Sequence, residues 1–245
     1  MTARSVAATA ARVLAQLRRD PRTIALLLAV PCVLLLLLHE LFTGRPEVFQ
    51  QVGVPMLGLF PLISMFLVTS ITMLRERTSG TLERLLTLPV SKLDILGGYG
   101  LAFATVAVVQ GTLVSVVGFG LLDLEVANAR IIVVALAVAN ATLGMALGLF
   151  VSAFAQTEFQ AVQFMPAFIF PQLLLCGLFV SRDDMAGWLS AIAGLLPMTY
   201  AYDALHRAAT EPDLDWHFTV DVAVTLGATA LALTHAAATL RRRTD

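Results

Sequence analysis

The chain has 245 residues, of which 58% are hydrophobic and only 13% are charged. Soluble domains carry about 25% charged residues, so this composition excludes an ordinary soluble fold. The formal net charge of −1 is uninformative, because what matters is where the charges lie along the chain. No nucleic-acid partner is expected. Cys32 and Cys176 lie within apolar runs and are predicted to be buried thiols, because no disulfide or metal spacing is present.

The amphipathic helix predicted for residues 1–22 comes first in the chain. Five apolar residues recur at helical spacing within a stripe of about 100°. They are Val6, Ala10, Val13, Leu14 and Leu17. Arg4, Arg12 and Arg19 fall on the far side, so the helix is expected to lie in the cytoplasmic interface with its basic face toward anionic headgroups. A solvated basic tail is the alternative.

Six segments are apolar over the roughly 20 residues that a membrane-spanning helix needs. They are Thr23–Phe42, Val52–Leu74, Ile95–Leu122, Ile131–Ala155, Ala161–Val180 and Val220–Leu240. A further charge-free run, Ala186–Tyr202, is interrupted by Pro197 and is predicted to be a re-entrant or interfacial segment. We therefore predict an all-α integral membrane protein with one transmembrane domain, residues 23–242.

The basic residues predict the orientation, because Lys and Arg concentrate in cytoplasmic loops. With the N-terminus inside, 12 of the 16 basic residues fall on the cytoplasmic side. Six spans then place both termini in the cytoplasm. The predominance of Arg over Lys and the abundance of Ala favour a bacterial source, so the predicted location is the inner (plasma) membrane.

The stretch Arg75–Asp94 stands out, because it carries seven charges between two apolar runs that carry none. Ser79 or Thr81 can cap the start of a short helix, and Pro89 stops it. Ser91, with Asp94 three residues later, is predicted to cap the start of the next span.

The apolar stripe of this short helix consists of Leu82, Leu85 and Leu86. A helix of about two turns is unstable alone in water, so it has to pack on something. One possibility is the headgroups or the membrane domain itself, and the other is a cytoplasmic partner.

The chain shows no energy source for moving a solute. A phosphate-binding GxxxxGK[ST] loop requires a Lys, and the single Lys92 is followed by Leu93. A proton relay needs buried carboxylates or a paired His, and the spans offer only Asp221 and His235, about four turns apart. An intramembrane enzyme is disfavoured too, because HExxH and GxSxG are absent. We expect no catalytic residue, metal or cofactor in this chain.

The residues from Glu76 to Val90, ERTSGTLERLLTLPV, resemble the ERxxGTLExLxxxPV element of ABC-2 type transporter permeases. The blocks EFQAVQFMP, PQLLLCGLF and LPMTYAYDAL are similar to the daunorubicin-resistance-type drug-export branch of that family. The resemblance covers nearly the whole chain.

This resemblance implies a coupling helix that docks into a separate ATP-binding cassette ATPase. The chain would be one half of a dimeric permease, paired with a second copy or a sister permease. Two ATPase subunits would complete the complex and carry ATP and Mg. The implied docking residues are Glu76, Gly80, Thr81, Leu82, Glu83, Leu85, Leu86 and Pro89.

A translocation pathway is predicted where polar side chains adjoin the prolines Pro166 and Pro171, which free backbone carbonyls. The candidate pathway residues are Gln163, Phe164, Gln172 and Tyr200. Helix–helix hydrogen bonds are the alternative role for the glutamines. Gly144 and Gly148 form a small-xxx-small pattern, which we assign to packing within the chain, with a dimer contact as the alternative.

The expected function is that of the membrane-spanning permease subunit of an ATP-binding cassette exporter. The 14 Phe residues are scattered without the aromatic track of a polysaccharide channel, which favours an amphipathic drug-like or lipid solute. A permease for lipid-linked polysaccharide is the first alternative. An ion-coupled carrier is the second, and the lack of buried carboxylates disfavours it.

Overall fold

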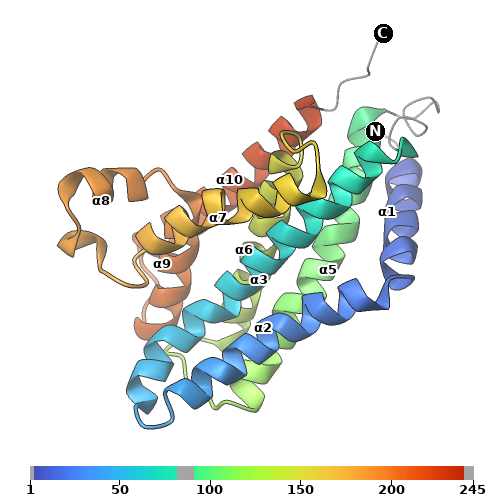
Figure 1. Ribbon diagram of the computed structural model, residues 1–245. Helices are drawn as coiled ribbons and strands as arrows, with labels where there is room; N and C mark the ends of the chain where they lie inside the picture. The colour runs from blue at the N-terminus through green and yellow to red at the C-terminus, as the bar shows by residue number, and fades with distance from the viewer. Residues whose placement is uncertain (1–2, 82–90, 240–245) are drawn as a thin grey trace.

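The computed structural model describes residues 3–81 and 91–239, and every regular element in these residues is a helix (Figure 1). The elements are α1 (Ala3–Arg18), α2 (Pro21–Leu41), α3 (Pro46–Thr78), α5 (Lys92–Gly120), α6 (Arg130–Val151), α7 (Glu158–Leu175), a 3-10 turn (Arg182–Asp184), α8 (Gly187–Ala193), α9 (Pro197–Thr210) and α10 (Trp216–Thr239). The predicted all-α class is therefore confirmed for the described part of the chain.

Five of the described helices are long and apolar enough to cross a membrane: α2, α3, α5, α6 and α10. They correspond to five of the six predicted spans, although α3 is much longer than predicted, with 33 residues. The helix α7, which corresponds to the predicted span Ala161–Val180, is not among them. It contains Pro166 and Pro171 together with three glutamines, and it ends at Leu175. Gly177 then takes a φ of 104°, which turns the chain away.

The long helix α3 forms the centre of the bundle, and α6 makes the most extensive contact with it. Two glycines of α6 allow this approach. A Cβ on Gly144 would lie 2.0 Å from the carbonyl oxygen of Leu62, and one on Gly148 would lie 2.5 Å from that of Phe66. Any side chain at these positions would separate the two backbones. The small-xxx-small pattern therefore serves packing within the chain, as predicted.

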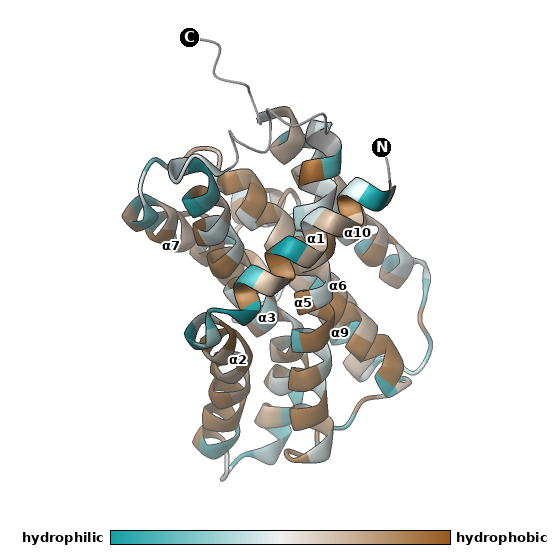
Figure 2. Ribbon diagram, turned by 90° about the vertical axis from the view of Figure 1, so that its right-hand side faces the viewer, coloured by the Kyte–Doolittle hydropathy of each residue, from teal (hydrophilic) through white to brown (hydrophobic). Residues whose placement is uncertain are grey.

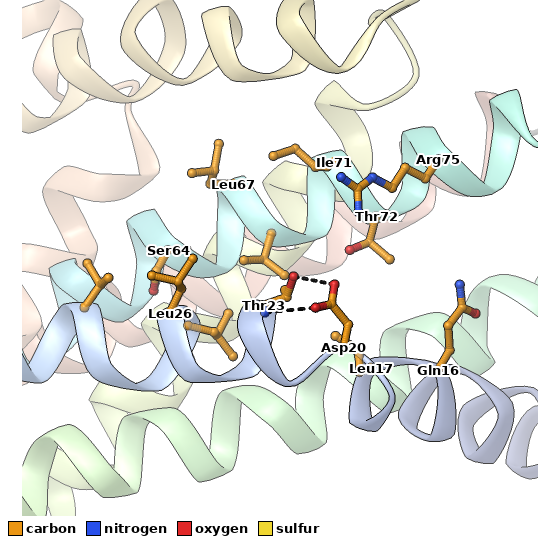
Figure 3. A pocket seen from close by; sticks show the side chains of 13 residues that line it. Gln16, Leu17, Asp20, Thr23, Leu26, Ser64, Leu67, Ile71, Thr72 and Arg75 are labelled. Atoms are coloured by element: carbon orange, nitrogen blue, oxygen red, sulfur yellow. Dashed lines mark hydrogen bonds between the residues drawn. The ribbon is translucent and has the colours of Figure 1, made fainter.

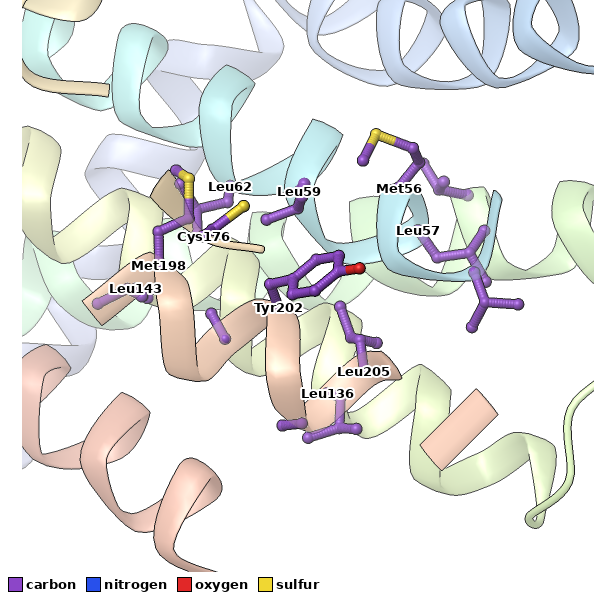
Figure 4. Packing of buried hydrophobic residues seen from close by; sticks show 14 of the residues in the cluster. Met56, Leu57, Leu59, Leu62, Leu136, Leu143, Cys176, Met198, Tyr202 and Leu205 are labelled. Atoms are coloured by element: carbon purple, nitrogen blue, oxygen red, sulfur yellow. The ribbon is translucent and has the colours of Figure 1, made fainter. Parts of the chain in front are cut away.

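The main core lies between α3, α6 and α9 (Figure 4). Leu57 and Leu62 of α3 and Leu143 of α6 are fully buried, and Met198 and Leu205 of α9 pack against them. The sequence did not predict the second half of α9. This contact explains it, because an amphipathic helix gains stability by burying its apolar face.

The directions of the helices place related ends together (Figure 1). The helix α1, the end of α3, the start of α5 and the end of α10 lie at one end of the bundle, upper right in Figure 1, and the turns α2–α3 and α5–α6 lie at the other. We call these the α1 end and the opposite end. Pro197 begins α9 after the short helix α8, so the predicted interruption at this proline is confirmed.

The predicted amphipathic helix forms as α1, which carries both hydrophilic and hydrophobic residues along its length (Figure 2). Its buried face differs from the prediction. Its apolar residues pack mainly against α5, a protein surface. Arg12, predicted to lie on the far side with the other arginines, is only 34% exposed and contacts α3 and α5. The predicted position of Arg12 was wrong, because the buried face of α1 is centred between its apolar stripe and a neighbouring stripe of polar residues. The thiols of Cys32 and Cys176 are free, and Cys176 is fully buried.

Candidate functional site

The predicted docking residues lie at the end of α3 and in the segment that follows it. Leu82, Glu83, Leu85, Leu86 and Pro89 lie outside the described residues, so the short helix itself stays a prediction. The described structure contains the three remaining docking residues: Glu76, Gly80 and Thr81.

Gly80 ends α3 for a local conformational reason. Ser79 is the last residue near the helical conformation, and its amide donates to the carbonyl of Arg75 over 2.9 Å. Gly80 then adopts a φ of 70°, in the left-handed region where a Cβ is unfavourable. The hydroxyls of Ser79 and Thr81 are 2.9 Å apart. In the structure, Ser79 therefore closes α3, and this turn explains the glycine without any partner.

Glu76 lies inside the bundle, with a side chain only 3% exposed. Its carboxylate is 3.6 Å from the guanidinium of Arg12 on α1. The same guanidinium donates to the hydroxyl of Tyr99 on α5 and lies 5.5 Å from the centre of that ring. Glu76 thus contacts the chain's own first helix, and in this conformation its side chain is not available to contact another protein.

The first turn of α5 is also bound by α1. Ser91 caps α5 by accepting the amide of Asp94, as the sequence predicts. The Asp94 carboxylate, only 4% exposed, accepts the hydroxyl of Ser5 over 3.0 Å. Glu76 and Asp94, which lie on either side of the segment 82–90 in the sequence, therefore both contact α1.

An ion pair joins the end of α3 to the start of α7. The Nε and Nη2 atoms of Arg75 donate to the two carboxylate oxygens of Glu158 over 2.7 and 3.0 Å. Both side chains are more than half exposed, so this pair adds only about 0–1 kcal/mol to stability. It connects the two helices without adding much stability.

A groove of about 400 Å³ lies between α2 and α3, next to the turn that joins α1 to α2 (Figure 3). Its walls are aliphatic, contributed by Leu17, Leu26, Leu27, Val30, Leu67, Val68 and Ile71. Gln16, Asp20, Thr72 and Arg75 gather where the groove meets the α1 end, and Ser64 lies toward its other end (Figure 3). The groove is thus apolar along its length and polar at its mouth.

Two polar contacts shape this groove. At the mouth, Asp20 caps α2, because its carboxylate accepts the hydroxyl of Thr23 over 2.7 Å and the Thr23 amide over 3.2 Å. These bonds lower the pKa of Asp20 below its usual value. At the other end, the buried Gln110 of α5 donates to the Leu27 carbonyl over 2.7 Å and to the Ser64 hydroxyl over 2.6 Å. Gln110 thereby ties α2 to α3.

The predicted pathway residues are not gathered at this groove. Gln163 is exposed, and Phe164 is half-buried against the core. Gln172 is buried and donates to the carbonyl of Phe168 in its own helix over 3.0 Å. Tyr200 donates to the carbonyl of Gly194 over 2.7 Å, which braces the turn between α8 and α9. None of the four predicted residues lines the groove.

A charged network ties α9 to its neighbours near the opposite end of the bundle. Arg207 is 3.1 Å from Asp221 at the start of α10 and 3.0 Å from Glu211. Arg182 is 3.4 Å from Asp203, and burial raises the pKa of Asp203. Asp221, which the sequence singled out as the one carboxylate in the spans, is therefore neutralised by an ion pair.

Comparison with known proteins places the chain in a family. A family model described as ABC-2 type transporter matches residues 4–208, well over half of the chain. The chain belongs to the ABC-2 type transporter family. Its apolar helices and this match together define it as a membrane-embedded component of such a transporter.

Two relatives of this ABC-2 chain are similar over part of their length. ABC transporter G family member 20 of Dictyostelium discoideum is 27% identical over 138 residues, which are 56% of this chain and 19% of the relative. The probable multidrug ABC transporter permease YbhR of Escherichia coli K12 is 26% identical over 148 residues, which are 60% of this chain and 40% of the relative. The chain spans less than half the length of either relative.

Sequence reasoning missed the contacts that α1 makes in this ABC-2 chain. A second stripe at helical spacing was present beside the apolar one: Ser5, Thr9, Arg12 and Gln16. Ser5, Thr9 and Arg12 are partly buried, whereas Gln16 is exposed. The signal was a polar row directly next to an apolar row, which marks a helix that packs on protein along one side and bonds to it along the edge.

Proposed function

We propose that this chain is the membrane-spanning permease subunit of an ATP-driven exporter for amphipathic drug-like or lipid molecules. Membership of the ABC-2 type transporter family carries the transport role. The Escherichia coli relative is named a probable multidrug permease, which supports a drug-like solute.

The solute class is inferred from the groove between α2 and α3. Burial of apolar surface is worth about 25 cal/mol per Å², so an aliphatic wall selects a hydrophobic body. The charged groups lie at the mouth, where Asp20 and Arg75 place both signs of charge. A molecule with an apolar body and one polar end matches this distribution, whereas a long polysaccharide does not.

The proposed topology has six spans, α2, α3, α5, α6, α7 and α10, with both termini in the cytoplasm of a bacterial cell. The grouping of α1, the end of α3 and the end of α10 at one end supports it (Figure 1). The helix α7 would cross as a shorter, polar-lined span, and α8 with the start of α9 would form the re-entrant segment on the outer side. The α1 end, with its arginines, would face the cytoplasm.

The energy would come from a separate ATP-binding cassette ATPase, with two ATPases and two permeases in the complex. The segment 82–90 follows the end of α3 at the α1 end, where a cytoplasmic partner would dock. Burial of Leu82, Leu85 and Leu86 would contribute roughly 1.5–3 kcal/mol each to that contact. Glu83 would contribute mainly orientation, since exposed ion pairs are worth about 0–1 kcal/mol.

An ion-coupled carrier is less well supported. Such a carrier needs an ionisable group that can gain and lose its charge within the spans. Asp221 is bound to Arg207 over 3.1 Å, so its charge already has a fixed partner. Among the described residues of the spans we find no other buried carboxylate apart from those that bind α1.

Co-purification with the ATPase tests the docking role. Leu85→Asp is expected to abolish co-purification with membrane insertion intact, because it places a charge in an apolar contact. Glu83→Ala should leave the complex assembled but reduce transport for each ATP hydrolysed. If Leu85→Asp binds the ATPase as the parent does, the segment is a membrane-surface element and the docking proposal fails.

Blocking the groove tests the solute site. Val68→Trp should fill the groove and abolish transport of a fluorescent phospholipid and a fluorescent amphipathic dye, while ATPase binding persists. Leu231→Trp is the matched control, because Leu231 of α10 is 61% exposed and does not line the groove. Equal transport by the Val68→Trp variant and the parent would contradict a solute path through this groove.

A further inference from the structure

We infer that the groove between α2 and α3 recognises a second feature of its solute, a hydrogen-bond donor (an O–H or N–H group) at the far end of the apolar body. The residues that would bind this donor are Ser64 of α3 and Gln110 of α5, which are bonded to each other. The inference rests on the proposed function and narrows the class of solute that the groove would carry.

Ser64 lies at the end of the groove that is remote from the charged mouth (Figure 3). It precedes Arg75 on α3 by about three turns, which correspond to about 16 Å along the helix axis. Leu67 and Ile71 line the groove between these two positions. A solute with its polar end at the mouth would therefore bring the other end of an apolar body of this length to Ser64.

The hydroxyl of Ser64 has room for one more hydrogen bond, as an acceptor. A serine hydroxyl has one hydrogen to donate and two lone pairs that accept. Ser64 donates to the carbonyl of Pro61 over 3.1 Å and accepts Nε2 of Gln110 over 2.6 Å. One lone pair of its Oγ atom remains, on a side chain that lines the groove.

The amide of Gln110 also has an acceptor to spare. The side chain is fully buried, and its Nε2 donates to the Leu27 carbonyl and to the Ser64 hydroxyl. Its Oε1 has no hydrogen-bond partner among the described residues. Exchanging the two amide atoms would not supply one, because the oxygen would then face the Leu27 carbonyl, which can only accept. Buried polar atoms without a partner are rare, so this oxygen calls for a donor.

The free positions at this end of the groove are thus all acceptors. The Nε2 and Oε1 atoms of Gln110 share one carbon, so the unpaired oxygen lies beside the Ser64 hydroxyl. A solute O–H or N–H group finds an acceptor here, whereas an ether or carbonyl oxygen finds no donor. One hydrogen bond of ordinary strength corresponds to about two- to tenfold in affinity, which sets the expected preference.

Three alkylphosphocholines that differ only at the chain end test this preference. They end in a methyl, a hydroxyl or a methoxy group, and each competes with the fluorescent amphipathic dye for the chain in lipid nanodiscs, below its micelle concentration. The hydroxyl compound should bind about two- to tenfold more tightly than the methoxy compound. The preference should be confined to chains that span about 16 Å, because a hydroxyl on a shorter chain would meet only the aliphatic wall.

Ser64→Ala should abolish or reverse the preference. It removes the Oγ acceptor and frees one N–H of Gln110, so the methoxy oxygen gains a donor that the parent does not offer. Thr105→Val is the matched control, because Thr105 of α5 is exposed and its hydroxyl donates to the Leu101 carbonyl of its own helix. The Thr105→Val variant should keep the preference of the parent.

The inference is overturned if the parent binds the hydroxyl and methoxy compounds equally at every chain length, or if folded Ser64→Ala keeps the preference of the parent. If Ser64→Ala does not fold, the chain-length series on the parent decides. Failure of the proposed function is a different result: the complex with the ATPase would then hydrolyse ATP without moving the dye. Dye transport without any preference for the hydroxyl compound would contradict the inference alone.

Discussion

The packing of α6 on α3 predicts a strong effect of Gly144→Ala. The added Cβ would lie 2.0 Å from the backbone oxygen of Leu62, whereas ordinary contacts at such a position are 3.4–4 Å. A backbone atom cannot rotate aside, so the helices have to separate locally. Overpacking of this kind costs about 1–3 kcal/mol. Replacing a helical Gly by Ala gains about 1 kcal/mol, so the expected net loss is about 0–2 kcal/mol.

Thermal unfolding in detergent measures this difference, and Gly227→Ala supplies the control. Gly227 lies within α10, and a Cβ there would meet nothing within 4 Å. Gly227→Ala should therefore be neutral or raise the midpoint, while Gly144→Ala lowers it. Equal midpoints for Gly144→Ala and Gly227→Ala would refute the close approach of α6 to α3. A Gly144→Ala variant that loses only its dimer would instead assign the glycine to an intermolecular contact.

Three further predictions concern topology, the tie at Gln110 and the cap of α2. A cysteine at Asp213 should react with a membrane-impermeant reagent in intact cells and one at Thr87 should not, and labelling at Thr87 from outside would reverse the orientation. Gln110→Leu should lower the free energy of unfolding by roughly 1–3 kcal/mol, because the Leu27 carbonyl and the Ser64 hydroxyl lose their hydrogen-bond donor. An unchanged midpoint in thermal or denaturant unfolding would contradict the bridge between α2 and α3. Because the pKa of Asp20 is lowered in the folded chain, its cap stabilises the fold above the usual Asp pKa of about 4, and this stabilisation is lost as the pH falls through the lowered pKa. Asp20→Asn should therefore remove this part of the acid sensitivity when thermal unfolding is measured at several pH values. An identical pH profile for the variant and the parent would contradict this prediction.

The sequence predicted the helices well wherever apolar runs were long and unbroken. The spans that became α2, α5 and α6 follow directly from hydropathy, and Pro197 begins α9 as expected. The span assigned to Ala161–Val180 was predicted too long, since hydropathy does not register where a helix ends. Cys176 is the C-cap of α7, and the positive φ of Gly177 follows it.

The site was harder to predict, because its contacts join distant parts of the chain. Glu76 was singled out through a family motif, but a motif does not say which way a side chain faces. Its partner Arg12 lies 64 positions earlier in the sequence, and a helical wheel of α1 alone placed that arginine outside. The groove combines residues of α1, α2 and α3, so only the packed structure could reveal it.

Transport by purified components in sealed vesicles tests the central claim most directly. With the ATPase subunit and ATP, vesicles containing the chain should move the fluorescent amphipathic dye. They should not do so with a non-hydrolysable analogue, and the chain alone should neither hydrolyse ATP nor move the dye. Dye movement by the chain alone under a proton gradient, or ATP hydrolysis by the chain alone, would contradict the assignment as an ATP-driven permease subunit.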